Sequence, residues 1–354
     1  KTSVMDSLVE NPEREFSPVS VFVQDLDHPG DFILTLLDAF YDRHPSLFHS
    51  LFNQSTQLVG KVLDQIKEVG VSGFKIALRE TDSEWEKNWK KHGDDFFQRV
   101  REHGSRVLFV VDEFPDFIIN MKKYHPELVS TFLSWFRGHR LKPHPKQDQV
   151  RWLLGGSVNL SSTLDSMGCL DEVNDFHSEP LPVLTHVQII EFVTRMLQGR
   201  GVEMSKNVPE VVAGRIGRPV PLFLQMLTQD LYRIWKKENR PLEQKDVERA
   251  FDDLVTSSAA REKLQHFYSR IRQYYIETKR SAAYDLLSRL AVSESGLERE
   301  ELMSNFLAMH EQSELNLPGY EQKQVFNELL CDLENDFYVS EVSPDRYDFS
   351  SGVM

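Results

Sequence analysis

The sequence predicts an α/β core of parallel strands with helices on both faces, followed by an all-helical lid and a winged-helix domain. Three observations support this fold class. Short β-branched strands alternate with amphipathic helices in the first half of the chain, helical patterns follow without strands, and the C-terminal part combines three helices with a hairpin. We expect three domains, the last incomplete at its C-terminal end: 1–180, 181–258 and 259–354.

The core is predicted from apolar strands that each precede or follow a helix. Strands are expected at 19–23, 106–112 and 150–154, and helices at 31–41, 96–103 and 126–140. Between them, 58–69 has helical spacing and 74–78 is a short candidate strand. The strand at 106–112 is continuously apolar, which is typical of a strand buried on both faces of a parallel sheet.

The second half of the chain is predicted to be mostly helical. Helices are expected at 187–199, 208–216, 221–238 and 243–255, which would form the lid. After a helix that ends near Tyr274, three further helices and a hairpin are typical of a winged helix. These elements are expected at 282–291, 299–310, 322–335, 338–342 and 347–349.

The composition is typical of an ordinary folded protein and excludes other classes. The chain has 354 residues with 40% hydrophobic and 27% charged side chains, as ordinary folded domains do. No apolar run approaches the roughly 20 residues of a membrane span. Cys169 and Cys331 are the two cysteines, which suits a reducing compartment, so we expect a cytoplasmic protein. Because the sequence opens on Lys1 rather than Met, we expect the natural protein to begin earlier.

The chain is acidic, with 41 Lys and Arg against 55 Asp and Glu and a net charge of −14. Such a molecule repels polyanions at long range, so DNA binding would need a local basic patch. The predicted third winged-helix helix and the hairpin are themselves acidic, which favours a protein partner over DNA. Their acidic residues are Glu328, Asp332, Glu334, Glu341, Asp345 and Asp348.

Lys1 and Thr2 precede an amphipathic helix, as the last two residues of a phosphate-binding P-loop do. In such a loop the lysine reaches the β- and γ-phosphates, the hydroxyl binds Mg²⁺, and the helix N-terminus, here including Ser3, faces the phosphates. The alternative is a chance Lys-Thr pair, because the glycines that make the motif specific would lie before Lys1.

Asp112 and Glu113 end the predicted strand at 106–112, as the carboxylates of a Walker B motif do. Asp112 would support Mg²⁺, and Glu113 would orient or deprotonate the attacking water. The alternative is a buried strand that meets solvent with two acidic residues.

Gly155, Gly156 and Ser157 end the neighbouring predicted strand, where Ser157 would sense the γ-phosphate. An ordinary strand-to-helix turn would have the same sequence. Ligands of open α/β sheets bind at the carboxyl ends of strands. The three motifs are therefore predicted to meet at one sheet edge.

A turn between two predicted helices contains Gly217, Arg218 and Pro219. It is interpreted as the turn of a lid that presents Arg215 or Arg218 to phosphate, with a plain helix-to-helix joint as the alternative. The histidines show no zinc spacing, and no turn has a nucleophile-elbow sequence.

In this order the motifs resemble, over essentially the whole chain, the P-loop ATPases of the AAA+ and STAND group. The resemblance is strongest to the prokaryotic "archaeal ATPase" type with a C-terminal winged helix. The matching segments are Lys1-Thr2, 107–115, 154–157, Asn174-Asp175 with Leu181, 217–219 and 284–349. The resemblance implies an α/β P-loop NTPase core that binds ATP and Mg²⁺. Arg137 and Arg140 are candidates for an arginine finger in an oligomer, although such residues more often solvate a helix end.

Together these features predict a Mg²⁺-dependent ATPase. The metal would be held by Thr2 and Asp112. The nucleotide would be bound by Lys1, Thr2, Ser3 and residues 217–219. The catalytic residues would be Glu113, Asp112 and Ser157. ATP would change the angle between core and lid, and the winged helix would pass this change to a protein partner or a second copy. Two alternatives stay open: a scaffold that holds ATP or ADP without turnover, and an ATP-dependent DNA-handling protein.

Overall fold

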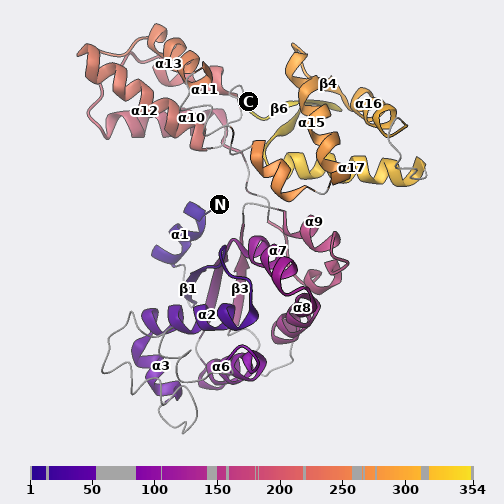
Figure 1. Cartoon of the computed structure of the whole chain (residues 1–354). Coiled ribbons are helices and arrows are strands. Elements are labelled where there is room, and N and C mark those ends of the chain that lie inside the picture. Colours follow the sequence, from indigo (N-terminus) through magenta and orange to yellow (C-terminus); the bar gives the residue numbers. More distant parts are fainter. Residues whose placement is uncertain are drawn as a thin grey trace. The chain divides into compact units, whose positions relative to one another are not determined.

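The computed structural model describes most of the chain and divides it into two compact units, Lys1–Ser178 and Glu179–Met354 (Figure 1). The described residues are 2–12, 16–52, 85–104, 106–141, 150–156, 159–179, 181, 183–217, 221–256, 265, 268–275, 277–311 and 319–351. The predicted helix at 58–69 and strand at 74–78 lie outside these residues. Each unit is described by itself.

A parallel sheet forms the centre of the first unit, as the sequence predicts. Its strands are β1 (Ser17–Phe22), β2 (Val107–Asp112) and β3 (Val150–Leu154), in the order β1-β2-β3. The register pairs Phe22 with Asp112 and Val111 with Leu154, so all three strands end at the same edge. β1 begins two residues before the predicted strand because Pro18, which suggested a loop, is tolerated on an edge strand.

Helices cover both faces of this sheet. Val107, Phe109 and Val111 belong to the large aromatic core, whereas α1 (Thr2–Glu10) contacts β1 and β2. Successive side chains of a strand point to opposite faces. Val110 and Asp112 therefore face away from the aromatic core, and the Asp112 side chain contacts Thr2 of α1. Among the described residues, the other helices of this unit are α2 (Pro29–Arg43), α3 (Pro45–Phe52), α6 (Trp89–His103), α7 (Phe114–Tyr124), α8 (Pro126–Leu141), α9 (Leu160–Asp165) and the 3₁₀ helix η3 (Leu170–Val173).

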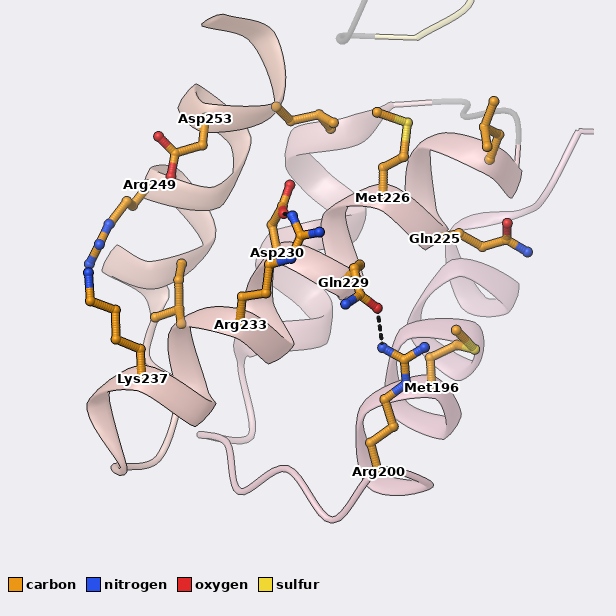
Figure 2. A pocket seen from close by; sticks show the side chains of 13 residues that line it. Met196, Arg200, Gln225, Met226, Gln229, Asp230, Arg233, Lys237, Arg249 and Asp253 are labelled. Atoms are coloured by element: carbon orange, nitrogen blue, oxygen red, sulfur yellow. Dashed lines mark hydrogen bonds and ion pairs between the residues drawn. The ribbon is translucent and has the colours of Figure 1, made fainter. Parts of the chain in front are cut away.

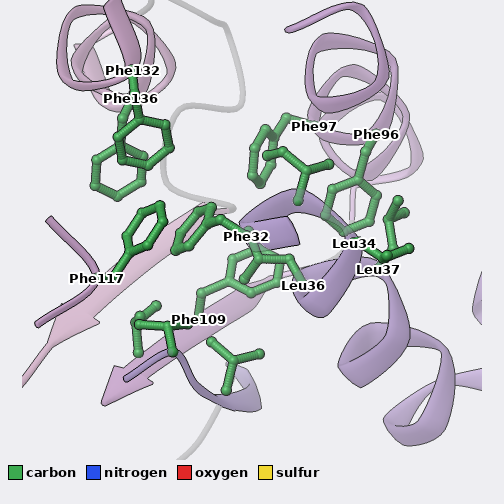
Figure 3. Packing of buried hydrophobic residues seen from close by; sticks show 14 of the residues in the cluster. Phe32, Leu34, Leu36, Leu37, Phe96, Phe97, Phe109, Phe117, Phe132 and Phe136 are labelled. Carbon is green, nitrogen blue, oxygen red and sulfur yellow. The ribbon is translucent and has the colours of Figure 1, made fainter. Parts of the chain in front are cut away.

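Aromatic side chains pack the other face (Figure 3). Phe32 of α2 stacks on Phe117 of α7 with ring centroids 5.2 Å apart and meets Phe132 of α8 edge-on at 5.3 Å. Phe109 of β2 stacks on Trp152 of β3 at 4.8 Å. Aromatic pairs in these geometries contribute about 0.5–1.5 kcal/mol each beyond the area they bury. The core therefore holds α7, which follows β2 directly, in a fixed position.

The second unit begins with a helical segment that has its own core. α10 (His186–Gln198), α11 (Val208–Ile216), α12 (Pro221–Glu238) and α13 (Gln244–Thr256) agree with the predicted helices within one or two residues. Thr185 and Gln188 form a capping box at the start of α10, which explains why the helix begins at His186. Val193, Leu197 and Leu227 are among the fully buried residues of this core.

The C-terminal part of this unit has a third core, to which Ile271 and Tyr275, further helices and a small sheet contribute. The helices are α15 (Glu277–Val292), α16 (Arg299–Glu311) and α17 (Gly319–Asn335). β4 (Leu297–Glu298), which the sequence pattern did not predict, joins the expected hairpin of β5 (Val339–Ser343) and β6 (Arg346–Phe349) in an antiparallel sheet of order β4-β6-β5. No helix among the described residues is long and apolar enough to cross a membrane.

One acidic residue assigned to the surface of α17 is buried. Asp332 is 7% exposed and accepts a hydrogen bond from Lys279 Nζ at 3.1 Å. The helical spacing placed Asp332 beside the apolar stripe, and the ion pair with Lys279 allows it to point inward. Glu328 also pairs with Lys279 at 3.1 Å, so the exposed surface of α17 is less acidic than predicted.

Candidate functional site

Backbone hydrogen bonds fix the residues that follow β2 beside those that follow β3. The Gly155 N–H donates to the Val111 carbonyl at 2.8 Å, and the Phe114 N–H donates to the Gly155 carbonyl at 3.0 Å. On the other side, the Val23 N–H donates to the Asp112 carbonyl at 3.1 Å. These bonds hold the ends of all three strands at one edge of the sheet.

Thr2 and Asp112, 110 residues apart in sequence, meet at this edge. The Thr2 hydroxyl donates to Asp112 Oδ2 at 2.6 Å, and Asp112 Oδ1 accepts from the Glu113 N–H at 3.0 Å. Asp112 is only 5% exposed. A buried carboxylate with these donors on both oxygens has a fixed orientation, so the first turn of α1 and the end of β2 form one polar cluster.

Glu113 has an unusual backbone conformation. Its φ is +58° and its ψ +36°, a left-handed conformation that non-glycine residues rarely adopt, and α7 begins at the next residue with a proline in its first turn. A Cβ atom at Gly156 would lie 3.3 Å from Glu113 Oε2. One carboxylate oxygen of Glu113 therefore lies close to Gly156.

Two glycines permit this close packing. A Cβ at Gly155 would lie 2.6 Å from Met5 Sδ of α1 and 3.6 Å from Asp112 Oδ1. A Cβ at Gly156 would lie 2.5 Å from Pro115 Cδ of α7. The turn at these glycines is visible in the sequence, whereas their contacts with Met5 and Pro115 arise only through tertiary packing.

The loop after β1 reaches the same edge. The side-chain amide of Asn120 in α7 donates to the Gln24 carbonyl at 2.7 Å, which ties this loop to α7. His28 caps α2 by accepting the Gly30 N–H at Nδ1 at 3.0 Å. Burial lowers the pKa of His28, and a neutral imidazole can accept this bond. His28 followed by Pro29 is a sequence signal of a helix start that the predicted boundary at residue 31 overlooked.

The structure brings together only part of the predicted site. Thr2 contacts Asp112, whose carboxylate also accepts the N–H of Glu113, and Ser3 is exposed in the first turn of α1. Lys1, Ser157, Arg218 and Pro219 lie outside the described residues. Gly217 lies in the second unit at the end of α11, with φ +73°, and forms an isolated antiparallel bridge with Ser351 after β6.

The cluster offers oxygen ligands of the kind that Mg²⁺ prefers. The Thr2 hydroxyl and the Asp112 carboxylate are hard donors 2.6 Å apart, so one cation can contact both. Among the described residues, no group of three or more His, Cys, Asp or Glu could hold a metal ion. Mg²⁺ is usually bound by one or two protein oxygens while phosphates and water complete its shell, so the pair fits this ion.

Arg140, a candidate arginine finger, has an intramolecular role. Its guanidinium binds both oxygens of Asp175 at 2.8 and 2.7 Å and lies between the rings of Phe136 and Phe176, 4.5 and 4.4 Å from their centroids. Burial raises the pKa of Asp175. The hydrogen bonds and the charge of Arg140 lower it by more than burial raises it, so the pKa of Asp175 lies below its ordinary value. Arg140 thus holds the segment after η3 against α8.

Arg137 also contacts this segment. It donates to Asn174 Oδ1 at 2.9 Å and lies 3.9 Å from Glu172. Both candidates therefore bind within their own chain, and neither simply solvates the end of α8 as the alternative interpretation proposed.

Comparison with known proteins gives distant similarity only. No family model and no curated protein matches the chain. Among solved structures, the Thermotoga maritima RuvB Holliday junction branch migration motor is 14% identical, with 72% of this chain and 70% of that chain covered and a TM-score of 0.33. The alignments cover 66% to 71% of the RuvB chains.

A second group comprises two Aeropyrum pernix proteins. The ORC2 protein in ADPNP-ADP complexes is 11% identical, with 99% of this chain and 77% of that chain covered and a TM-score of 0.39. The ORC1 protein in complex with DNA is 11% identical, with 95% and 75% covered and a TM-score of 0.33. Similarity at this level assigns no activity, which must be inferred from the site itself.

Proposed function

We propose that this chain is a Mg²⁺-dependent P-loop ATPase whose nucleotide site is the sheet edge around Asp112. The observation that carries the proposal is the 2.6 Å hydrogen bond from Thr2 Oγ1 to Asp112 Oδ2. It joins the first turn of a helix to a buried carboxylate at the end of the central strand. This is where a phosphate-bound metal would need both a hydroxyl and a carboxylate.

The metal would be held by Thr2 and Asp112, which are already in contact. Bound there, Mg²⁺ would neutralise phosphate charge. The N–H groups of the first turn of α1, including that of Ser3, are not satisfied within the helix and would face the phosphates, and Lys1 would contact them with its ammonium group. These assignments make α1 the phosphate-binding helix.

Glu113 would act on the attacking water. Its left-handed backbone and its position beside Gly156 direct a half-buried carboxylate to the edge where Asp112 also lies. A carboxylate there can accept a proton from water or orient it by a hydrogen bond. Ser157, two residues after Gly155, would contact the γ-phosphate.

The second unit would respond to the nucleotide. We assign residues 181–258 as the lid and 259–354 as a winged-helix domain of the STAND type, after a core at 1–180. Three helices with a β4-β6-β5 sheet support the winged-helix assignment. The Gly217-Arg218-Pro219 turn would contact nucleotide, and the bridge from Gly217 to Ser351 would carry its movement to the C-terminal domain.

The partner of the C-terminal domain is proposed to be a protein or a second copy of the chain in the cytoplasm. The hairpin exposes Glu341 and Asp345, and Arg346 is paired with Glu298 at 2.6 Å. Phosphate contacts need free Lys and Arg on the approaching elements, so this surface disfavours DNA.

Phosphate release by the full-length protein tests the proposal. We expect ATP hydrolysis that requires Mg²⁺ and is abolished by EDTA. ATP binding without phosphate release would instead support the nucleotide-gated scaffold. Absence of both ATP binding and hydrolysis would refute the nucleotide site.

A further inference from the structure

A groove of about 770 Å³ runs along the helical segment of the second unit (Figure 2). Its floor is one face of α12, and its sides come from the end of α10 and from α13. Four residues of α12 that line the groove follow one another at intervals of four, seven and four residues: Leu222, Met226, Arg233 and Lys237. Side chains at these intervals share one face of a helix.

The groove has the length of a helix of about four turns. Leu222 and Lys237 lie near the two ends of α12 and both line it. Fifteen residues of α-helix rise about 22 Å, at 1.5 Å per residue. All elements that line the groove are helices, so it offers no strand edge to which an extended peptide could add.

The charge of the groove is opposite to that of the chain. Four cations and two carboxylates line it, which gives 4 − 2 = +2, whereas the whole chain carries −14. The cations are Arg200, Arg233, Lys237 and Arg249, and the carboxylates are Asp230 and Asp253. Lys237 and Arg233 are exposed, and Figure 2 shows both toward the end of the groove between α12 and α13. Arg233 pairs with Asp230 at 2.7 Å and Arg249 pairs with Glu238 at 2.6 Å, so an acidic side chain at this end would share these two cations with the protein's own carboxylates.

The other end has three apolar side chains beside polar ones. Met196, Leu222 and Met226 line it together with Arg200 and Gln225, and Leu222 is 37% exposed while Met226 is 9% exposed. Methionine side chains are flexible and polarisable and can fit apolar groups of different shape. A duplex of DNA would contact the basic end but leave these side chains without apolar partners, so the combination favours a helix with both acidic and apolar residues.

We propose that this groove is the docking site for an acidic amphipathic helix of a protein partner. Its apolar residues would pack against Met196, Leu222 and Met226, and its carboxylates would meet Arg233, Lys237 and Arg249. The inference is independent of ATP hydrolysis, because none of these residues belongs to the proposed nucleotide site.

A labelled peptide titrated against the full chain tests this proposal. The probe is a helical peptide of about 18 residues, long enough for the four to five turns it needs, with leucine at every third or fourth position and glutamate on the remaining faces. We expect saturable binding in fluorescence anisotropy. Scrambling the same composition should weaken binding at least about tenfold, because it destroys the apolar stripe.

Variants locate the binding to the groove. The double variant Arg233→Glu/Lys237→Glu should weaken binding of the peptide at least about tenfold, and Leu222→Ser should weaken it several-fold. These residues are exposed, so the fold should be retained, which circular dichroism checks. Lys245→Glu is the matched control: Lys245 is an exposed cation on α13 outside the groove and should leave the affinity unchanged.

Three results would overturn the proposal. The first is equal affinity for the scrambled peptide, which would indicate charge alone. The second is unchanged peptide affinity in the double variant, and the third is the absence of saturable binding. Tighter binding of a duplex DNA oligonucleotide that is lost in the same double variant would assign the groove to DNA instead.

Discussion

At the scale of single residues, Glu113 has a strained backbone and a proposed role in activating water. A non-glycine residue in the left-handed region costs on the order of 1–2 kcal/mol. The conformation persists because Phe114 is hydrogen-bonded to Gly155 and Pro115 fixes the first turn of α7. Such strain commonly marks functional sites. Here one carboxylate oxygen of the strained residue lies close to Gly156.

Replacing Glu113 separates binding from turnover. Glu113→Gln keeps the size and shape of the side chain but removes the base, so ATP affinity should stay within about twofold while kcat falls by about 10²–10⁴. Glu127→Gln, an exposed glutamate in the first turn of α8, is the control and should match wild type. Wild-type turnover in Glu113→Gln would exclude Glu113 as the catalytic carboxylate.

At the scale of elements, α1 is held on the sheet by a contact that only glycine permits. In Gly155→Ala the new methyl group would meet Met5 Sδ, so α1 must shift or the side chain must move. Overpacking of this kind typically costs about 1–3 kcal/mol. We expect a lower free energy of unfolding together with weaker ATP binding, because α1 also positions Thr2.

Gly138→Ala provides the opposite case within α8. A Cβ at Gly138 meets nothing within 4 Å, and alanine favours a helix over glycine by about 1 kcal/mol. This variant should gain stability in denaturant titrations with no change in ATP affinity. Equal effects of the two substitutions would contradict the packing described between α1 and β3.

The Arg140–Asp175 pair predicts a pH dependence of stability. Because the pKa of Asp175 is lowered from 3.8 in the folded protein, the pair stabilises the fold above that value, and the contribution is lost as the pH falls through the folded pKa. Arg140→Gln should therefore destabilise the protein at pH 7, and the deficit should shrink as the pH falls below about 4. Arg137→Gln should produce the same change to a smaller extent, because the charge of Arg137 also lowers the pKa of Asp175 but its side chain is more exposed than that of Arg140. Urea titrations at several pH values measure the free energy of unfolding of both variants. If Arg140→Gln lost the same free energy relative to wild type at every pH, the Arg140–Asp175 pair would not be the source of the pH dependence.

The sequence predicts some elements well and others poorly, for physical reasons. The strand at 106–112 is continuously apolar because it is buried on both faces, and the boundaries of α10 to α13 follow from amphipathic periodicity and caps. α7 was missed because Phe114 and Pro115 were interpreted only as the end of a motif. Proline at the first helical position, after a left-handed residue, is instead how α7 begins.

The candidate site was predictable where topology alone decides it. Parallel strands place Asp112 and Gly155 at one edge, so their proximity follows from strand order. The contact of Met5 with Gly155 depends on how α1 packs, which no local pattern specifies. The same holds for Arg140, whose ring contacts and ion pair form only when η3 returns to α8.

At the scale of the whole molecule, net charge and the acidic hairpin predict weak DNA binding. The chain at −14 repels a duplex, and salt would weaken the few available phosphate contacts further. The full chain should bind duplex DNA no tighter than about 10⁻⁵ M at physiological salt, within the range of non-specific binding. Electrophoretic or anisotropy titrations at two salt concentrations check this. Sub-micromolar affinity with a steep salt dependence would restore the DNA-handling alternative.

The central claim is that Thr2 and Asp112 together hold Mg²⁺ with ATP, and calorimetric titration of the full-length protein tests it most directly. We predict saturable Mg²⁺–ATP binding that weakens at least about tenfold in Thr2→Ala, in Asp112→Asn and in EDTA, with the two substitutions less than additive because they remove one shared contact. Thr2→Ser keeps the hydroxyl and should bind like wild type. Equal ATP affinity in all variants, with and without Mg²⁺, would contradict the account.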